Sequence, residues 1–388
     1  MAVKAIRPTE TFTKILNFFH LICSLVGADL SNDNYRVNII TVIVILSIII
    51  YFIFTATTVA SVFSEDWTYM LEASCMVGSV LQGCTKLISA FIFKNKICGM
   101  RAELERLYAE YEVKGDEYVK TLNKSCERMW QVTKVVGQMY LYAAVGIILT
   151  LIYFVIATTQ KVYVMHFFIP GIDVNTQTGY LITLGVHAVV FMSGAFGLFA
   201  GDLFILLFLT QPMLFVDLLV LKVKALNEAA AQKTNAVQRL LIDIIEWHQY
   251  YTDYNKRCNH LFYYIISVQI VTSGISIICT LYIILMGDWP GAYMYILIAF
   301  SGLYLYCILG TKIQECNSAF CKELCNINFY DLDIKSREMM VLIIMKAQNP
   351  VEIKIGGFLP LSVQTALKIT KTIYGLFTMM IRFLEEGQ

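Results

Sequence analysis

Long apolar stretches alternate with polar segments along the whole chain of 388 residues. Seven stretches come close to or exceed the roughly 20 residues that a helix needs to cross the apolar core of a bilayer. They cover residues 37–63, 71–93, 136–157, 180–208, 261–286, 292–309 and 358–383. An earlier run, 15–27, is too short to span and contains Asn17 and His20, which is typical of an interfacial helix. The pattern predicts an all-α membrane protein with seven transmembrane helices.

Three polar segments also have the apolar spacing of helices: 100–111, 237–251 and 336–346. They are too short and too polar to span, so we expect them to form long helices below the bilayer, on its cytoplasmic side. Pro350 should end the last of them, because proline lacks the backbone N–H that a helix needs.

Composition supports this class of protein. Hydrophobic residues make up 57% of the chain and charged residues only 15%, where soluble domains carry about 25%. An ordinary soluble enzyme, a disordered chain and a disulfide-stapled protein are therefore excluded. No Walker loop, paired-His motif or nucleophile elbow is present, and the spacing of Cys316, Cys321 and Cys325 is not that of a zinc site. We expect no enzymatic activity, cofactor, metal or nucleic-acid partner.

The placement of Lys and Arg sets the expected orientation. Of the 30 such residues, 25 lie in the N-terminal segment and in every second loop, whereas the opposite loops contain only Lys161. Because cytoplasmic loops are enriched in Lys and Arg, the N-terminus is predicted to be cytoplasmic and the C-terminus extracellular. A G-protein-coupled receptor has the reverse orientation. The chain also lacks that class's Asp-Arg-Tyr and Asn-Pro-x-x-Tyr motifs.

The expected organisation has four parts. Residues 1–36 form a cytoplasmic N-terminal segment with the interfacial helix, and 37–312 form the first six transmembrane helices with cytoplasmic extensions. Residues 313–350 form a cytoplasmic helical region, and 351–388 the last transmembrane helix with a short outer tail. The predicted outer segments are too short to form a binding domain. A ligand site must therefore lie among the helices, covered by the loop 158–179, and its ligand must be small and hydrophobic.

Small, polar and aromatic side chains in the outer halves of spans two to five are the ligand-binding candidates. They are Cys75, Gly78, Ser79, Gly146, Thr150, Tyr153, Phe154, Thr183, His187, Phe191, Ser273, Ile277 and Thr280. Helix packing is the alternative for each, since such residues are common between membrane helices. His187 either contacts ligand or bonds to a neighbouring helix carbonyl. Lys86 is expected to snorkel to the inner interface, and Asp202 and Asp217 to cap helices or form ion pairs.

The last helix is the most polar of the seven. Lys371, Tyr374, Thr378 and Ile381 share one face, and Phe377 lies beside it. A lipid-facing helix would not tolerate this polarity, whereas a pore-lining helix would. One such helix cannot enclose a pore, so this interpretation requires an oligomer.

The C-terminal third resembles the insect odorant receptor family. The resemblance rests on the segment Ile343-Ile344-Met345-Lys346-Ala347-Gln348-Asn349-Pro350, followed by Gly356-Gly357-Phe358, Leu361-Ser362 and Lys368 to Thr372 with Tyr374. Glu246-Trp247-His248-Gln249 and Gly201-Asp202-Leu203-Phe204 are similar to other parts of that family. The length and the predicted topology agree along the whole chain.

This resemblance implies a ligand-gated, non-selective cation channel in the plasma membrane of sensory dendrites. The segment between spans four and five is about 50 residues, without the large insertion of the family's co-receptor Orco. The chain is thus similar to a ligand-selective tuning subunit that forms a tetramer with Orco. The resemblance places the odorant pocket in the outer halves of spans two to six and a subunit anchor in 313–350. It assigns the pore and gate to Tyr374, Phe377, Thr378 and Ile381.

Two alternatives remain. A gustatory-type channel would work without a co-receptor, but that branch ends in a Thr-Tyr-x5-Gln-Phe motif, and here Ile373 precedes Tyr374. A transporter or a metabotropic seven-helix receptor would be supported by a cytoplasmic C-terminus.

Overall fold

The computed structural model describes residues 7–28, 38–63, 67–157, 163–174, 176–232, 236–286 and 289–386. Within these residues the chain is almost entirely helical. The helices are α1 (Pro8–Leu25), α2 (Ile39–Val62), α3 (Trp67–Cys75), α4 (Val77–Ile92), α5 (Lys94–Glu112), α6 (Asp116–Ala157), α7 (Gln177–Leu209), α8 (Gln211–Ala231), α9 (Val237–Met286), α10 (Ala292–Cys325), α11 (Ile334–Ala347) and α12 (Val363–Glu386). A 3₁₀ turn, Phe329–Asp331, precedes α11, and a short antiparallel hairpin of β1 (Lys354–Ile355) and β2 (Leu359–Pro360) precedes α12.

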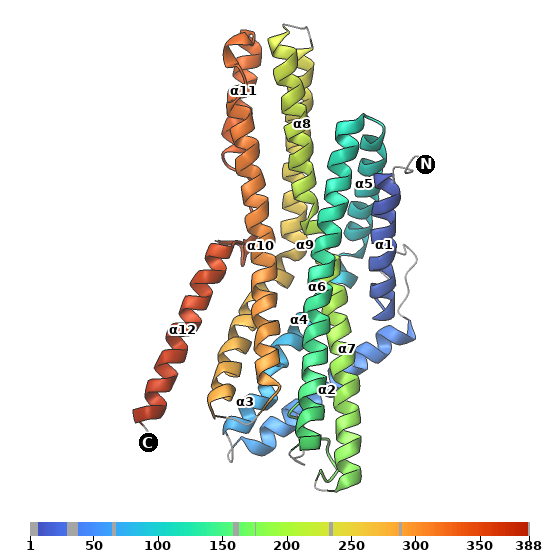
Figure 1. Cartoon of the computed structure of the whole chain (residues 1–388), viewed down its shortest axis with the longest axis vertical. Coiled ribbons are helices and arrows are strands. Elements are labelled where there is room, and N and C mark those ends of the chain that lie inside the picture. Colours follow the sequence, from blue (N-terminus) through green and yellow to red (C-terminus); the bar gives the residue numbers. More distant parts are fainter. Residues whose placement is uncertain are drawn as a thin grey trace.

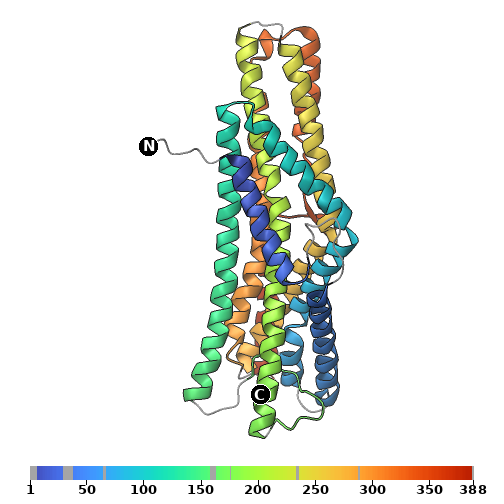
Figure 2. The same ribbon diagram turned by 90° about the vertical axis from the view of Figure 1, so that its right-hand side faces the viewer.

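The long helices α6, α7, α9 and α10 run along the long axis of the molecule (Figure 1). With 50 residues, α9 is about 75 Å long at 1.5 Å per residue, so it passes through the bundle and beyond it. Its first half joins α8, α10 and α11 in a narrow projection at the top of Figure 2. The buried core is continuous from this projection into the bundle.

Six segments of the described chain are long and apolar enough to cross a membrane. They overlap the first six predicted spans, on α2, α3 with α4, α6, α7 with α8, α9 and α10. The seventh prediction corresponds to α12, whose 24 residues give a length of about 36 Å but whose composition is more polar. The side of the membrane on which each terminus lies stays a prediction, and Lys161 lies outside the described residues.

Two predicted spans differ from the observed helices in detail. The second is divided at Met76 into α3 and α4. The seventh was predicted to begin at Phe358, which is wrong: residues 358–360 belong to the hairpin and α12 begins at Val363. Two consecutive glycines with φ of +60° and +83°, Gly356 and Gly357, make the tight turn between β1 and β2.

The three predicted helices in polar segments are present. Residues 100–111 lie in α5, 237–251 form the first turns of α9, and 336–346 lie in α11. The last of these ends at Ala347, three residues before Pro350, and Gln348 closes its C-terminus.

The last helix stands apart from the other spans. Its first half packs on α9 and α10, where Ala366 and Ile373 are buried. Tyr304 of α10 and Thr370 are joined there by a hydrogen bond of 3.0 Å between hydroxyls. Farther along, α12 diverges from the bundle (Figure 1), and Tyr374 is 67% exposed. This half of the helix therefore presents an uncovered surface in the single chain.

Candidate functional site

A largely apolar cavity of about 160 Å³, called here the main cavity, lies among α2, α4, α6 and α7. Val44, Ile48, Val80, Val190 and Phe191 are among its apolar walls. Small residues leave the space open, since their side chains do not fill the gap between the helices. They include Gly83, Ala143, Ala144, Gly194 and Gly197. A concave apolar site with few polar groups is the usual form of a small-molecule site.

The loop 163–174, called here the roof, covers one end of this cavity. Its Met165 is part of the cavity wall. The backbone N–H of Phe168 donates to Thr58 Oγ1 of α2 at 2.8 Å. His187 of α7 donates from Nε2 to the carbonyl oxygen of Phe167 at 3.1 Å. These bonds fix the roof to two different helices, as expected of a loop that covers a site.

A histidine and a glutamate fix the roof at a third point. Nε2 of His166 lies 3.4 Å from a carboxylate oxygen of Glu72, on α3. The ring of His166 also meets those of Tyr69 and Trp289 edge to face. Burial, reinforced by the nearby His187, lowers the pKa of His166 to about 4. His166 is therefore neutral at physiological pH.

Of the thirteen candidate ligand residues, Ser79 and Phe191 line the main cavity. Thr183 and His187 are buried near the roof and do not line the main cavity. From the sequence, His187 was expected either to contact ligand or to bond to a carbonyl of a neighbouring helix. The carbonyl that it binds belongs to Phe167 of the roof and not to a helix.

Five other candidates lie at the contact of α3 and α4 with α9. Cys75 and Thr280 are 3.1 Å apart, and Gly78 is so close to Ser276 that a Cβ would lie 2.5 Å from its Oγ. Ser273 accepts from Gln82 at 3.2 Å, and Ile277 is fully buried. These side chains hold helices together in this structure.

The remaining candidates are on α6. Gly146 packs against Met294, and the Thr150 hydroxyl donates to the Gly146 carbonyl within its own helix. Tyr153 is 63% exposed. Phe154 lies in α6, but its side chain is outside the described residues. The structure thus does not gather all thirteen residues around one cavity, and their contact with a ligand stays a prediction.

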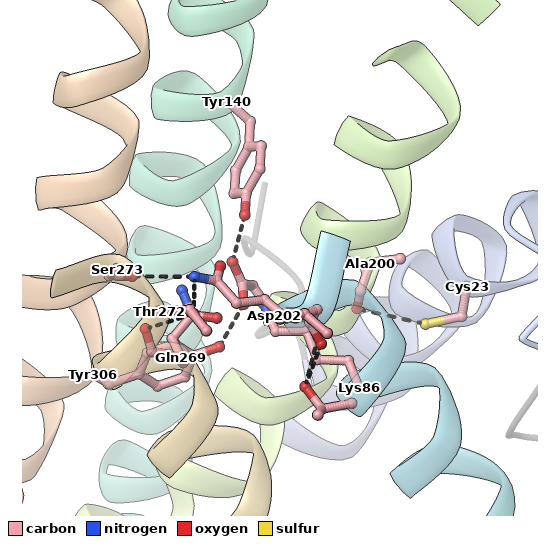
Figure 3. A network of polar contacts seen from close by, with 12 residues as sticks. Cys23, Lys86, Tyr140, Ala200, Asp202, Gln269, Thr272, Ser273 and Tyr306 are labelled. Carbon is pink, nitrogen blue, oxygen red and sulfur yellow. Dashed lines mark hydrogen bonds and ion pairs between the residues drawn. The ribbon is translucent and has the colours of Figure 1, made fainter. Parts of the chain in front are cut away.

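A buried ion pair joins α4 to α7 beside the main cavity. Lys86 and Asp202 are 5% and 2% exposed, and Lys86 Nζ donates to Asp202 Oδ1 (Figure 3). Tyr306 donates to the same oxygen, and Tyr140 donates to Oδ2 at 2.6 Å. We call these four residues the Asp202 cluster. Buried charges require this degree of pairing, because an unpaired charge loses its hydration without compensation.

The expectation that Lys86 snorkels to the interface is wrong. Gly201 allows the side chain to turn inward, since a Cβ at that position would lie 2.7 Å from Lys86 Cδ. The expected pairing of Asp202 is confirmed. Asp217 also pairs, with Arg128 at 2.9 Å and Lys124 at 3.7 Å.

A smaller cavity of about 30 Å³, called here the polar cavity, adjoins the main cavity. The ligand candidates chosen from the sequence did not include its glutamines, Gln82 and Gln269, although two amides within apolar spans were a visible signal. Among the described residues, no group of three or more His, Cys, Asp or Glu side chains is arranged to hold a metal.

The predicted pore and gate residues lie on the divergent half of α12. Tyr374 points to the uncovered surface, whereas Phe377, Thr378 and Ile381 are half-buried. Thr378 donates to the Gly375 carbonyl of its own helix at 2.9 Å. These residues of one chain cannot surround a pore by themselves.

Three kinds of comparison identify relatives of the whole chain. The family model of the 7tm odorant receptors matches residues 66–374. Odorant receptor 83c of Drosophila melanogaster is 30% identical, over 96% of this chain and 98% of its own length. Odorant receptor 85f of the same species is 21% identical over 38% of this chain and 39% of its own.

Solved structures show the same fold. The olfactory receptor OR5 of the insect Machilis hrabei superposes with a TM-score of 0.75, at 16% identity, over 96% of this chain and 98% of that one. The same receptor in complex with eugenol gives a TM-score of 0.71, at 16% identity, over 96% and 99%. The seven-helix architecture is consistent with these structures. By the family match and the full-length relative, the chain belongs to the insect odorant receptor family.

Proposed function

We propose that this chain is the odorant-binding tuning subunit of a heteromeric, ligand-gated, non-selective cation channel. A small hydrophobic odorant binds among the outer halves of the helices and opens a pore lined by α12. The N-terminus is cytoplasmic and the C-terminus extracellular. The channel resides in the plasma membrane of sensory dendrites.

The main cavity is the observation that carries this proposal. It has apolar walls, lies within the helices that span the membrane, and extends to Met165 of the roof. An apolar molecule can partition from the bilayer or from the outer surface into such a space, where it gains contacts without losing hydrogen bonds to water. The eugenol complex of the Machilis receptor supports a small odorant as ligand.

The divergent half of α12 supports an assembly. This helix carries polar residues such as Thr372 and Thr378 together with exposed Tyr374 and Met379. Lipid would solvate its polar positions poorly. Four α12 helices, from this subunit and Orco subunits in one tetramer, would enclose a water-filled pore and bury the apolar positions. Phe377 and Ile381 would then form a constriction that excludes water until the helices move apart.

Coexpression tests the proposal. The chain and Orco are expressed together in oocytes, and currents are recorded during application of a broad panel of volatile odorants that includes eugenol. We expect inward cation current to a subset of the panel, and none from this chain alone. Surface labelling must show the subunit at the membrane. Surface expression without current to any odorant would contradict the proposal, and current without Orco would favour a gustatory-type channel.

A further inference from the structure

The polar cavity shares part of its wall with the main cavity. Ser79, Tyr140, Leu198, Tyr295 and Ile298 line both. The rest of the wall of the smaller space carries two glutamine amides, three serine hydroxyls and the Asp202 carboxylate beside apolar side chains. Its volume of about 30 Å³ is enough for one water molecule or for a ligand's hydroxyl group. A ligand in the main cavity therefore has a polar recess directly beside it.

Most polar groups in this recess already have partners. The amide nitrogen of Gln82 donates to Thr272 at 2.8 Å and to Ser273 at 3.2 Å. The Asp202 carboxylate accepts from Lys86, Tyr306 and Tyr140 (Figure 3). Both hydrogens of the Gln82 nitrogen are thus used, and the Asp202 carboxylate already accepts three hydrogen bonds. The negative charge is also neutralised by Lys86, so a cation gains little in this recess.

Gln269 differs from these neighbours. Its side chain is 4% exposed and lines the polar cavity, and Oε1 has no hydrogen-bond partner among the described residues. Its Nε2 lies against Gly302, where an added Cβ would be 3.0 Å away. Burying a carbonyl oxygen without a donor is unfavourable. Oε1 itself has almost no accessible surface in this structure, so a small turn of the amide toward the polar cavity would present it to an incoming hydrogen-bond donor.

Ser79 provides a second acceptor, at the boundary between the two cavities. Tyr295 donates its hydroxyl proton to the Cys75 carbonyl oxygen at 3.2 Å. Either hydroxyl can donate in the 2.8 Å contact between Ser79 and Tyr295; when Tyr295 donates to Cys75, Ser79 supplies the proton of this contact. This leaves lone pairs of Ser79 Oγ free to accept.

We infer that the polar cavity is the subsite for a ligand hydroxyl, and that this receptor prefers alcohols or phenols to the corresponding ethers. This inference rests on the proposed odorant-binding function. The apolar part of the ligand lies in the main cavity beside Phe191. Its O–H group donates to Gln269 Oε1 or Ser79 Oγ. An ether of the same shape has no proton to donate and leaves the acceptors unpaired.

Matched ligands and matched variants test the subsite. Wild type and Gln269→Met, each coexpressed with Orco, are exposed to alcohols and phenols and to their methyl ethers, for example 1-hexanol and 1-methoxyhexane. We expect the alcohols to activate wild type at lower concentration. Loss of one neutral hydrogen bond in Gln269→Met should raise their EC50 by about three- to tenfold and leave the ethers unchanged. Gln138→Met, on the exposed surface of α6, is the control and should behave as wild type.

Thermal unfolding of the purified wild-type complex gives a readout that needs neither the variant nor a current. We expect an alcohol to raise the melting temperature more than its methyl ether at equal concentration. Currents with equal potency for alcohols and ethers would overturn the subsite and leave the proposed channel function intact. An alcohol-selective melting shift without current would support the subsite and contradict the channel function. Neither current nor shift would overturn both.

Discussion

The main cavity and the Asp202 cluster lie side by side in the bundle but have opposite character. The main cavity has apolar walls and unfilled volume. The Asp202 cluster contains a buried ion pair whose carboxylate receives donors from α4, α6 and α10. Lys86 and Tyr140 belong to both, so the two regions share a border.

This contrast supports the proposal that ligand recognition and stability are located in different regions of the bundle. Ionisable residues within membrane spans often mark functional sites, yet in the Asp202 cluster they are fully paired and join helices. In the proposed function, recognition falls to the neighbouring main cavity, where packing is incomplete. Charges in a span are thus a poor guide to the ligand site unless one of them lacks a partner.

Removal of Asp202 should produce the largest effect. Asp202→Ala leaves Lys86 as a buried unpaired charge and two tyrosine hydroxyls without their acceptor, at a cost of about 3–5 kcal/mol. We expect loss of surface expression and a large fall in melting temperature. Asp217→Ala is a matched control, since this carboxylate also pairs with basic residues but is partly exposed; its cost should be about 1 kcal/mol or less.

A double variant sharpens this expectation. Lys86→Met with Asp202→Leu removes both charges, so it should recover much of the expression lost in Asp202→Ala. Normal expression of Asp202→Ala alone would show that the cluster does not stabilise the bundle.

Substitution of Phe191 should affect ligand potency instead. Phe191→Ala enlarges the main cavity and removes apolar contact with the odorant, so EC50 should rise by about tenfold or more. Surface expression should stay close to wild type. Phe196→Ala is the control on the same helix, because Phe196 is half exposed. Dose–response curves unchanged by Phe191→Ala would exclude this wall from the ligand site.

His187 should have a smaller, indirect effect. His187→Ala removes the bond to the Phe167 carbonyl and loosens the roof. We expect a potency shift for all ligands without a change in their ranking, whereas Phe191→Ala should change the ranking. A changed ranking in His187→Ala would instead indicate direct contact with odorant.

The smallest expected effect is acid sensitivity of the roof. The pKa of His166 is about 4 in the folded chain and about 6.5 when exposed, so only the unfolded state gains this proton as the pH falls below 6.5. Stability should therefore decrease with acidification, by about 1 kcal/mol between pH 7.5 and 5.5. His166→Gln should remove this component of the pH dependence of melting. If the melting temperature of His166→Gln falls with acidification as much as that of wild type, His166 does not cause the acid sensitivity.

The sequence predicted the helices well, because each apolar stretch must cover about 30 Å of bilayer core with satisfied backbone groups. It also distinguished α12 by its polarity. The start of α12 was predicted too early, since the hairpin before it includes apolar Phe358 and Leu359.

The site could be predicted only in part. Ser79 faces the main cavity, whereas the adjacent Gly78 packs on α9, and composition does not reveal which face of a helix turns inward. The partners Lys86 and Asp202 are 116 residues apart, and His187 binds a loop whose path no periodicity determines. Helix rotation and loop path are set by tertiary packing, which one sequence does not display.

The most direct test is a cryo-electron microscopy structure of the coassembled channel bound to its strongest odorant. We predict ligand density in the main cavity beside Phe191, an unchanged Lys86–Asp202 pair, and a central pore lined by α12 from every subunit. Ligand density elsewhere, with the main cavity filled by side chains, would contradict the proposed division between recognition and stability.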